Sequence, residues 1–131
     1  MDKEYKIAII GLGYVGLPLA LAFAEHYQLV GYDINKNRVA NLNKGIDSNL
    51  NVSVNVNSNL RFSNNESDLK ESTIYIITVP TPVDKENVPD LSFLKSASQL
   101  VAKYLKKEGI VIYESTVYPG VTEDICVPIL A

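Results

Sequence analysis

The 131-residue chain has almost none of the residues from which metal centres and disulfide frameworks are built. It holds one cysteine, Cys126, and one histidine, His26, so no disulfide can form within the chain and no cluster of Cys and His ligands is available. Cys126 lies between two apolar residues, which suits a buried, inert thiol better than a nucleophile. His26 suits a surface position at a helix end. This cysteine usage predicts a reducing, cytoplasmic environment.

Long apolar runs and an excess of positive charge are also missing. No stretch approaches the roughly 20 apolar residues of a membrane helix. Acidic residues and a glycine-rich turn precede the apolar residues 15–24, unlike the layout of a signal peptide. Twelve basic residues against fifteen acidic ones give a net charge of −3. We therefore expect neither a membrane nor a nucleic acid among the partners.

What the sequence does contain is an alternation of apolar runs with segments of helical spacing. The runs are β-branched and continuous, as in strands buried on both faces of a parallel sheet. They cover residues 7–10, 29–32, 74–79 and 110–113. Helical spacing covers residues 14–26, 35–43 and 91–107. The pattern predicts one α/β domain over residues 1–131, with a doubly wound, mainly parallel sheet and helices on both faces.

Other segments carry weaker signals. In the first helix we expect Val15, Leu19, Ala22 and Phe23 to form the buried stripe. Residues 60–62 suit a brief strand, and residues 66–71 suit one or two helical turns. The Asn-rich stretch 45–59 has valines alternating with polar residues, which would fit an edge strand, but we expect a surface loop. A last helix is expected to begin at Thr122, and its apolar end predicts that the domain continues beyond this chain.

The segment Gly11-Leu12-Gly13-Tyr14-Val15-Gly16 matches the pattern G-x-G-x-x-G between a buried strand and an apolar helix. Gly11 permits a tight turn, Gly13 lets the backbone approach a pyrophosphate, and Gly16 brings the helix close to the strand. The N-terminus of the helix offers free N–H groups to phosphates. This context predicts a Rossmann-type dinucleotide site.

Asp33 ends the second strand, 22 residues after Gly11. A carboxylate at this place accepts hydrogen bonds from the ribose hydroxyls and repels a 2′-phosphate, so we expect NAD rather than NADP. Lys36 and Arg38 lie close by and keep NADP open as an alternative. Asp33 could also be a simple N-cap of the next helix, and any glycine of the motif an ordinary turn residue.

Two further polar segments follow predicted strands. Thr78-Val79-Pro80-Thr81-Pro82-Val83-Asp84 forms a proline-stiffened loop, and Glu114-Ser115-Thr116-Val117-Tyr118-Pro119-Gly120 places hydroxyls after the last strand. Ligands of open α/β sheets bind outside the carboxyl ends of the strands. All the unusual segments therefore fall where a ligand is expected.

Four stretches carry a resemblance to the UDP-glucose/GDP-mannose dehydrogenases, and to their bacterial UDP-N-acetylhexosamine branch in particular. They read IAIIGLGYVGLPLALAFA, VGYDINKNRVANLNKGID, ITVPTPVD and IVIYESTVYPGVTEDICVPIL, and they cover nearly the whole chain. The resemblance implies that NAD is the cofactor. It implies cofactor contacts for Gly11, Gly13, Tyr14, Val15, Gly16, Asp33, Arg38, Thr78, Val79, Thr81 and Ser115. It places Thr116 beside the reacting sugar carbon.

The resemblance also implies the reaction, in which the C6 hydroxyl of a UDP-sugar is oxidised twice to the acid for polysaccharide synthesis. It places the catalytic cysteine, a central helical domain that dimerises and a UDP-sugar-binding domain beyond Ala131, so this chain alone is expected to bind NAD without turnover. The Asn-rich stretch 48–59 departs from the family's acidic pattern. Two alternatives stay open, namely another NAD-dependent Rossmann dehydrogenase and a nucleotide-sensing regulatory domain.

Overall fold

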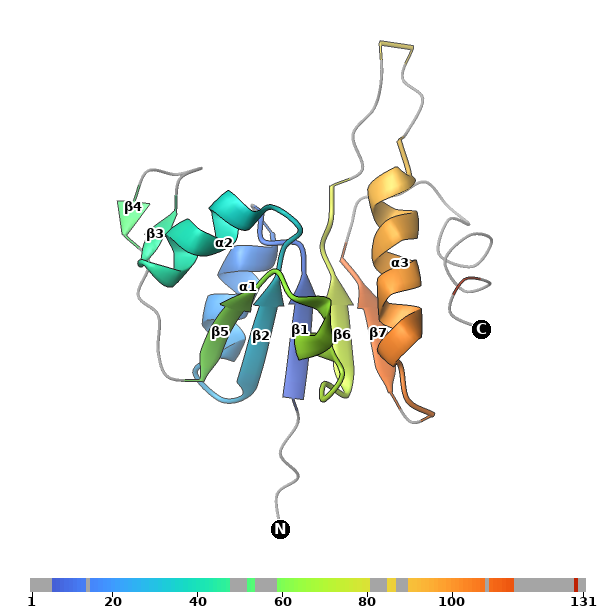
Figure 1. Ribbon diagram of the computed structural model, residues 1–131, viewed down its shortest axis with the longest axis horizontal. Coiled ribbons are helices and arrows are strands. Elements are labelled where there is room, and N and C mark those ends of the chain that lie inside the picture. The colour runs from blue at the N-terminus through green and yellow to red at the C-terminus, as the bar shows by residue number, and fades with distance from the viewer. Residues whose placement is uncertain are drawn as a thin grey trace.

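A parallel sheet forms the centre of the computed structural model, which describes residues 6–13, 15–47, 52–53, 59–80, 85–86, 90–107, 109–114 and 129. Within these residues the sheet has five strands in the order β5-β2-β1-β6-β7 (Figure 1). The strands are β1 (Lys6–Ile10), β2 (Gln28–Tyr32), β5 (Leu60–Ser63), β6 (Ile74–Ile77) and β7 (Ile110–Tyr113). Every pairing in this sheet is parallel. The four predicted strands and the brief fifth one are thus confirmed.

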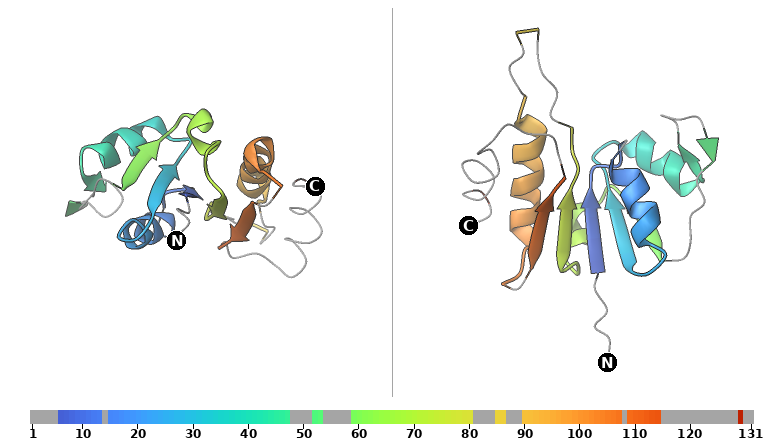
Figure 2. Two further views of the ribbon diagram at one scale, coloured as in Figure 1. Left: turned by 90° about the horizontal axis from the view of Figure 1, so that it is seen from below. Right: turned by 180° about the vertical axis from the view of Figure 1, so that it is seen from behind.

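Helices cover both faces of the sheet, as predicted (Figure 2). One buried cluster joins β1 to α1 (Gly16–Phe23) and α2 (Lys36–Asn43). A second cluster joins the opposite face to α3 (Ser92–Tyr104) and to the short 3-10 helix η1 (Glu66–Leu69). Because successive residues of a strand point to opposite faces, Ile7 and Ile9 enter the first cluster and Ala8 and Ile10 the second. The doubly wound α/β fold is therefore confirmed.

The buried side of α1 differs from the expected one. Its buried residues are Gly16, Leu17 and Ala20, whereas Val15 is 49% exposed. The helix is apolar on nearly every side, so periodicity alone does not define its buried face. The close contact of Gly16 with the preceding turn sets the rotation of the helix instead. Pro18 falls in the first turn, where its missing N–H costs nothing.

The Asn-rich stretch contains paired strands, so the expectation of a plain loop is wrong there. Two residues of β3 (Ile46–Asp47) pair antiparallel with two residues of β4 (Val52–Ser53). The structure places this small ladder beside α2, apart from the main sheet (Figure 1). With only two paired residues on each side, the alternation of apolar and polar residues is too short to distinguish these strands from a loop in the sequence.

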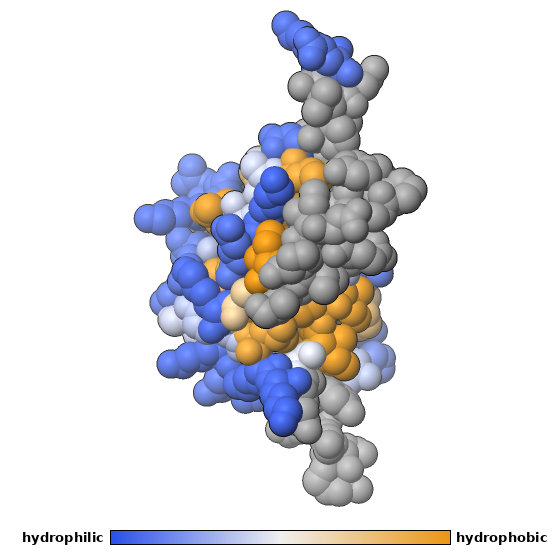
Figure 3. Space-filling view, turned by 90° about the vertical axis from the view of Figure 1, so that its right-hand side faces the viewer, coloured by the Kyte–Doolittle hydropathy of each residue, from blue (hydrophilic) through white to orange (hydrophobic). Residues whose placement is uncertain are grey.

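The outer strand β7 exposes apolar side chains on one face. Ile110 and Ile112 are 52% and 38% exposed, and Figure 3 shows an apolar area on this side of the molecule. The predicted helix from Thr122 and Cys126 lie outside the described residues. In the described part of the chain no helix has the length and apolarity to cross a membrane.

Candidate nucleotide-binding site

The chain reverses direction across the sheet between β1 and β6. It runs from β1 outward to β2 and β5, then returns to β6 on the other side of β1. Loops on either side of such a switch point diverge and leave a crevice at the carboxyl ends of the strands. A cavity of about 730 Å³ opens at this place, lined by residues of the glycine turn, the β2 end, the β6 end and α3. Its size suits a nucleotide.

The glycine turn after β1 is built as its sequence predicts. Gly11 has φ of +100°, a conformation that side chains rarely adopt, and its amide donates to the Tyr32 carbonyl at 2.8 Å. A Cβ atom on Gly16 would lie 1.8 Å from the Gly11 carbonyl oxygen. A Cβ on Gly13, in contrast, would meet no atom within 4 Å. Gly16 thus closes the turn, and Gly13 leaves open space beside it.

Thr78 fastens the β6 end to this turn. Its hydroxyl lies 2.6 Å from the Gly11 carbonyl oxygen and 3.1 Å from that of Ile10, and its amide donates to Ile10 at 2.9 Å. The side chain is 8% exposed. Thr78 therefore links the β6 end to the carbonyl groups of the turn while remaining part of the cavity wall.

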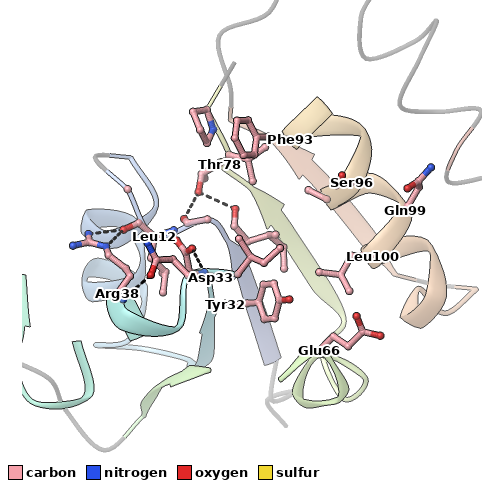
Figure 4. A pocket seen from close by; sticks show the side chains of 18 of the residues that line it. Leu12, Tyr32, Asp33, Arg38, Glu66, Thr78, Phe93, Ser96, Gln99 and Leu100 are labelled. Atoms are coloured by element: carbon pink, nitrogen blue, oxygen red, sulfur yellow. Dashed lines mark hydrogen bonds between the residues drawn. The ribbon is translucent and has the colours of Figure 1, made fainter. Parts of the chain in front are cut away.

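Asp33 directly follows β2, and its carboxylate is held in place by the backbone. One oxygen accepts from the Leu12 amide at 2.9 Å, and the other accepts from the Asn35 amide at 2.9 Å (Figure 4). The N-cap of α2 is Asn35, whose side chain accepts from the amides of Asn37 and Arg38. The capping alternative for Asp33 is therefore wrong, and the partly exposed carboxylate faces the cavity as a fixed acceptor.

Arg38 is buried behind the turn, at 7% exposure. Its guanidinium donates from Nε to the Leu12 carbonyl at 2.8 Å, with a second bond from Nη2 to the same oxygen (Figure 4). The Arg38 guanidinium thus satisfies the Leu12 carbonyl, whose residue also donates its amide to Asp33, and the side chain lines the cavity. Arg38 therefore holds the glycine turn in position, in addition to the cofactor contact that is expected of it.

The N-terminus of α1 points into the same region. No side chain caps it, and no acidic residue lies in its first turn. The amides of Gly13 and Gly16 donate to no acceptor within the described part of the chain. Free amides and the positive end of a helix dipole together favour an anionic group such as a pyrophosphate.

The far wall of the cavity comes from α3 and η1. Their helical character is predictable from the sequence, but their place in the site is not. Phe93 of α3 and Ile34, which follows β2, line the cavity as exposed apolar side chains. Glu66 accepts from the Lys103 ammonium at 3.1 Å, and this bond lowers the pKa of its carboxyl below the usual value. Burial, followed by the nearby Glu66, raises the pKa of Tyr32. Ile34 could have been noticed as the lone apolar residue between Asp33 and Asn35.

Of the eight predicted site residues that the structure describes, six line one cavity. The lining includes Gly11, Gly13, Asp33, Arg38, Thr78 and Val79. Val15 and Gly16 lie in the adjoining turn, although neither belongs to the lining itself. Tyr14, Thr81, Ser115 and Thr116 lie outside the described residues. No group of His, Cys, Asp and Glu residues suited to a metal ion occurs among the residues that are described.

Comparison with protein families distinguishes between the functions that the sequence left open for this site. Residues 5–131 match the model of the UDP-glucose/GDP-mannose dehydrogenase family, NAD binding domain. The chain therefore belongs to this family. Membership in the UDP-glucose/GDP-mannose dehydrogenase family makes NAD its cofactor. It also favours a nucleotide-sugar dehydrogenase domain over the two alternatives that the sequence left open, another Rossmann dehydrogenase and a regulatory domain.

Individual members of the family are similar over almost the whole chain. A UDP-N-acetyl-D-glucosamine 6-dehydrogenase of Pseudomonas aeruginosa is 52% identical in an alignment that covers 98% of this chain and 31% of that protein. A UDP-N-acetyl-D-mannosamine dehydrogenase of Pyrococcus horikoshii is 39% identical over 90% of this chain and 30% of its own length. The chain thus spans about a third of the length of these curated relatives.

A solved structure confirms the fold. The UDP-D-ManNAc dehydrogenase from Pyrococcus horikoshii superposes with a TM-score of 0.83 at 34% identity, over 95% of this chain and 31% of that one. The agreement covers nearly all of the NAD-binding domain described here.

Proposed function

We propose that the cavity at the carboxyl ends of β1, β2 and β6 binds NAD for the oxidation of a UDP-N-acetylhexosamine. The observation that carries this proposal is the fixed carboxylate of Asp33 beside the open space at Gly13. A ribose at Asp33 and a pyrophosphate at Gly13 would occupy neighbouring parts of one cavity. When bound, NAD supplies the hydride acceptor.

Each part of the site has its own task in this proposal. The Asp33 carboxylate accepts from the ribose hydroxyls, because its two oxygens keep lone pairs free after bonding to Leu12 and Asn35. The amides of Gly13 and Gly16 bind the pyrophosphate. Val79 and Thr78 support the nicotinamide half, with Tyr14, Val15, Thr81 and Ser115 as further cofactor contacts. Thr116 stays assigned to the sugar side, next to the reacting carbon.

The substrate and the reaction belong to the longer protein. The relatives at 52% and 39% identity are named for UDP-N-acetyl sugars, which supports a substrate of this class and the 6-dehydrogenase reaction. Homodimerisation through a central helical domain and a separate UDP-sugar-binding domain stay predictions, as does the cytoplasmic location.

We also infer that residues 1–131 alone bind NAD without turning over a UDP-sugar. The one cysteine, Cys126, lies between two apolar residues in the sequence, which suits an inert thiol, and neither cysteine nor histidine is found among the described residues that line the cavity. Uronic acid formed by the purified chain from UDP-N-acetylglucosamine and NAD⁺ would overturn this inference.

Calorimetric titration with NAD⁺ and with NADP⁺ tests the binding site. We expect NAD⁺ to bind at least about tenfold more tightly, because the Asp33 charge repels the 2′-phosphate. Asp33→Asn removes that charge and should narrow the difference between the affinities for NAD⁺ and NADP⁺. Glu71→Gln is the control for the loss of a charge, since Glu71 is an exposed carboxylate that pairs with Lys6 at 3.2 Å and lines a different cavity. Equal affinity of the wild-type chain for both nucleotides would contradict the role of Asp33.

A further inference from the structure

The cavity continues past Asp33 into a cleft with apolar walls. Ile34, at the β2 end, is 78% exposed, and Phe93, in the first turn of α3, is 46% exposed. Both line the cavity, together with Ala97 and Leu100 on the inner side of α3. Large apolar side chains exposed in a cavity favour a flat, weakly hydrated ligand group, because covering them removes apolar surface from water.

The inner end of this cleft holds a hydroxyl with no partner. The Tyr32 side chain is 8% exposed and lines the cavity, and its hydroxyl has no hydrogen bond to any described residue. Burial raises the pKa of Tyr32, with Glu66 as the next cause, so the hydroxyl keeps its proton at neutral pH. Since none of the buried side-chain oxygens of the described residues lacks a partner, the Tyr32 hydroxyl oxygen is open to the cavity, where it can donate to a ligand. Tyr32 therefore offers the ligand a hydrogen bond.

Glu66 offers a complementary acceptor next to it. Its Oε1 atom accepts both from Lys103 at 3.1 Å and from the Tyr104 hydroxyl at 3.2 Å. Its Oε2 atom has no partner among the described residues. The two donors keep the carboxylate charged and fix its orientation. Figure 4 shows Tyr32, Leu100 and Glu66 together at the end of the cavity away from Phe93.

We propose that Tyr32 and Glu66 form a base-reading pair that selects a 6-aminopurine over a 6-oxopurine at this end of the site. The proposal rests on the binding of NAD in this cavity. Tyr32 directly precedes Asp33, the acid proposed to bind the ribose, and both line the cavity. A base joined to that ribose therefore lies within reach of the Tyr32 hydroxyl.

The selection follows from hydrogen-bond polarity. The exocyclic amino group of adenine donates, and the Oε2 atom of Glu66 only accepts. The neighbouring ring nitrogen of adenine accepts, and the Tyr32 hydroxyl donates. A 6-oxo group in the same place would turn its lone pairs toward the carboxylate, and the ring N–H beside it would face a hydroxyl. The 6-oxopurine thus loses a charge-assisted bond and gains a repulsion.

Titration of the purified chain with NAD⁺ and with nicotinamide hypoxanthine dinucleotide tests the pair. The two dinucleotides differ only at the base, in the 6-amino or 6-oxo group and in the proton on the ring nitrogen beside it. We expect NAD⁺ to bind at least about tenfold more tightly, as for other charge-assisted bonds. In Glu66→Gln the amide can also donate to the oxo group, so the ratio of the two affinities should fall toward one. Tyr32→Phe should weaken NAD⁺ binding without unfolding the chain.

Glu71→Gln is the matched control. Glu71 follows η1, loses the same charge on substitution, and pairs with Lys6 at 3.2 Å at the opposite edge of the sheet, where it lines a different cavity. Its variant should keep the wild-type ratio. A merely structural role of Glu66 would lower both affinities equally and leave the ratio unchanged, which would overturn the inference.

The outcomes also separate this inference from the proposed function. Equal binding of both dinucleotides by the wild-type chain would overturn base selection while leaving the NAD site intact. Binding of neither dinucleotide by a chain that melts cooperatively would overturn the NAD site and the base selection that rests on it.

Discussion

At the scale of single residues, the glycine turn separates two roles that one sequence motif combines. Gly16 has no room for a side chain because its Cβ would lie 1.8 Å from a backbone oxygen that no rotamer can move. Gly13 has room, since no protein atom lies within 4 Å of its Cβ position. The protein itself therefore requires Gly16, whereas the space beside Gly13 is needed only by a ligand.

This difference predicts opposite results for two alanine substitutions. Gly16→Ala should lower the free energy of unfolding by about 1–3 kcal/mol or more, as overpacking does. Gly13→Ala should leave stability unchanged or raise it by up to about 1 kcal/mol, because the unfolded chain loses freedom. It should nevertheless weaken NAD⁺ binding about tenfold or more, by occupying the space proposed for the pyrophosphate. Urea unfolding and calorimetric titration of both variants measure these effects. Unchanged NAD⁺ affinity in Gly13→Ala would contradict the pyrophosphate position.

Thr78 carries a prediction about the link between β6 and the turn. Thr78→Val keeps the shape of the side chain but removes the donor to the Gly11 carbonyl, so unfolding should become easier by about 1–3 kcal/mol. Thr78→Ser should recover most of this loss. Thr73→Val is the matched control, because the Thr73 hydroxyl also donates to a backbone oxygen, that of Lys6, but is exposed. Equal losses for the two valine variants, read from urea unfolding curves, would argue against a special role of Thr78.

At the scale of elements, the sequence predicted the strands and α2 well, and two other segments poorly. The strands of the sheet are continuous apolar runs, and α2 presents Val39 and Leu42 on one side of an otherwise polar segment, so burial follows directly from the pattern. In α1 nearly every residue is apolar, and a tertiary contact at Gly16 decides which side is buried. In the β3–β4 ladder only two residues pair on each side, too few for periodicity to register.

Strand β7 carries the prediction at this scale. Ile76 and Ile112 are directly paired in β6 and β7 and point to the same face, but Ile76 is 4% exposed and Ile112 is 38% exposed. Ile76→Ala should lower the free energy of unfolding by about 2–5 kcal/mol, since it leaves a cavity in the core. Ile112→Ala should cost only about 1 kcal/mol, because water already reaches part of the side chain. Similar costs in chemical denaturation would mean that Ile112 is covered in solution by a further part of the protein.

At the scale of the whole molecule, the fold brings together residues that no sequence window contains. Asp33 and the glycine turn were predictable because each follows a strand, and strand ends share one edge of the sheet. Tyr32, Glu66 and Phe93 come from three different elements, and only the crossover of α3 and η1 to one face places them around a common cavity. The sequence therefore indicated the phosphate and ribose half of the site but not the walls around the base.

A ligand that binds this cavity should stabilise the entire chain, because the glycine turn, the β2 end and α3 all surround it. NAD⁺ at about one hundred times its dissociation constant should add about 2.7 kcal/mol to the free energy of unfolding and raise Tm on the order of 10 °C. With binding about tenfold weaker or more, the same concentration of NADP⁺ should raise Tm about half as much or less, and Gly13→Ala should remove about half of the NAD⁺ effect or more while melting like the wild-type chain. Thermal unfolding followed by circular dichroism measures all three. An NAD⁺ shift that persists in Gly13→Ala but disappears in Glu71→Gln would place the nucleotide elsewhere on the molecule, because Glu71 lines a different cavity.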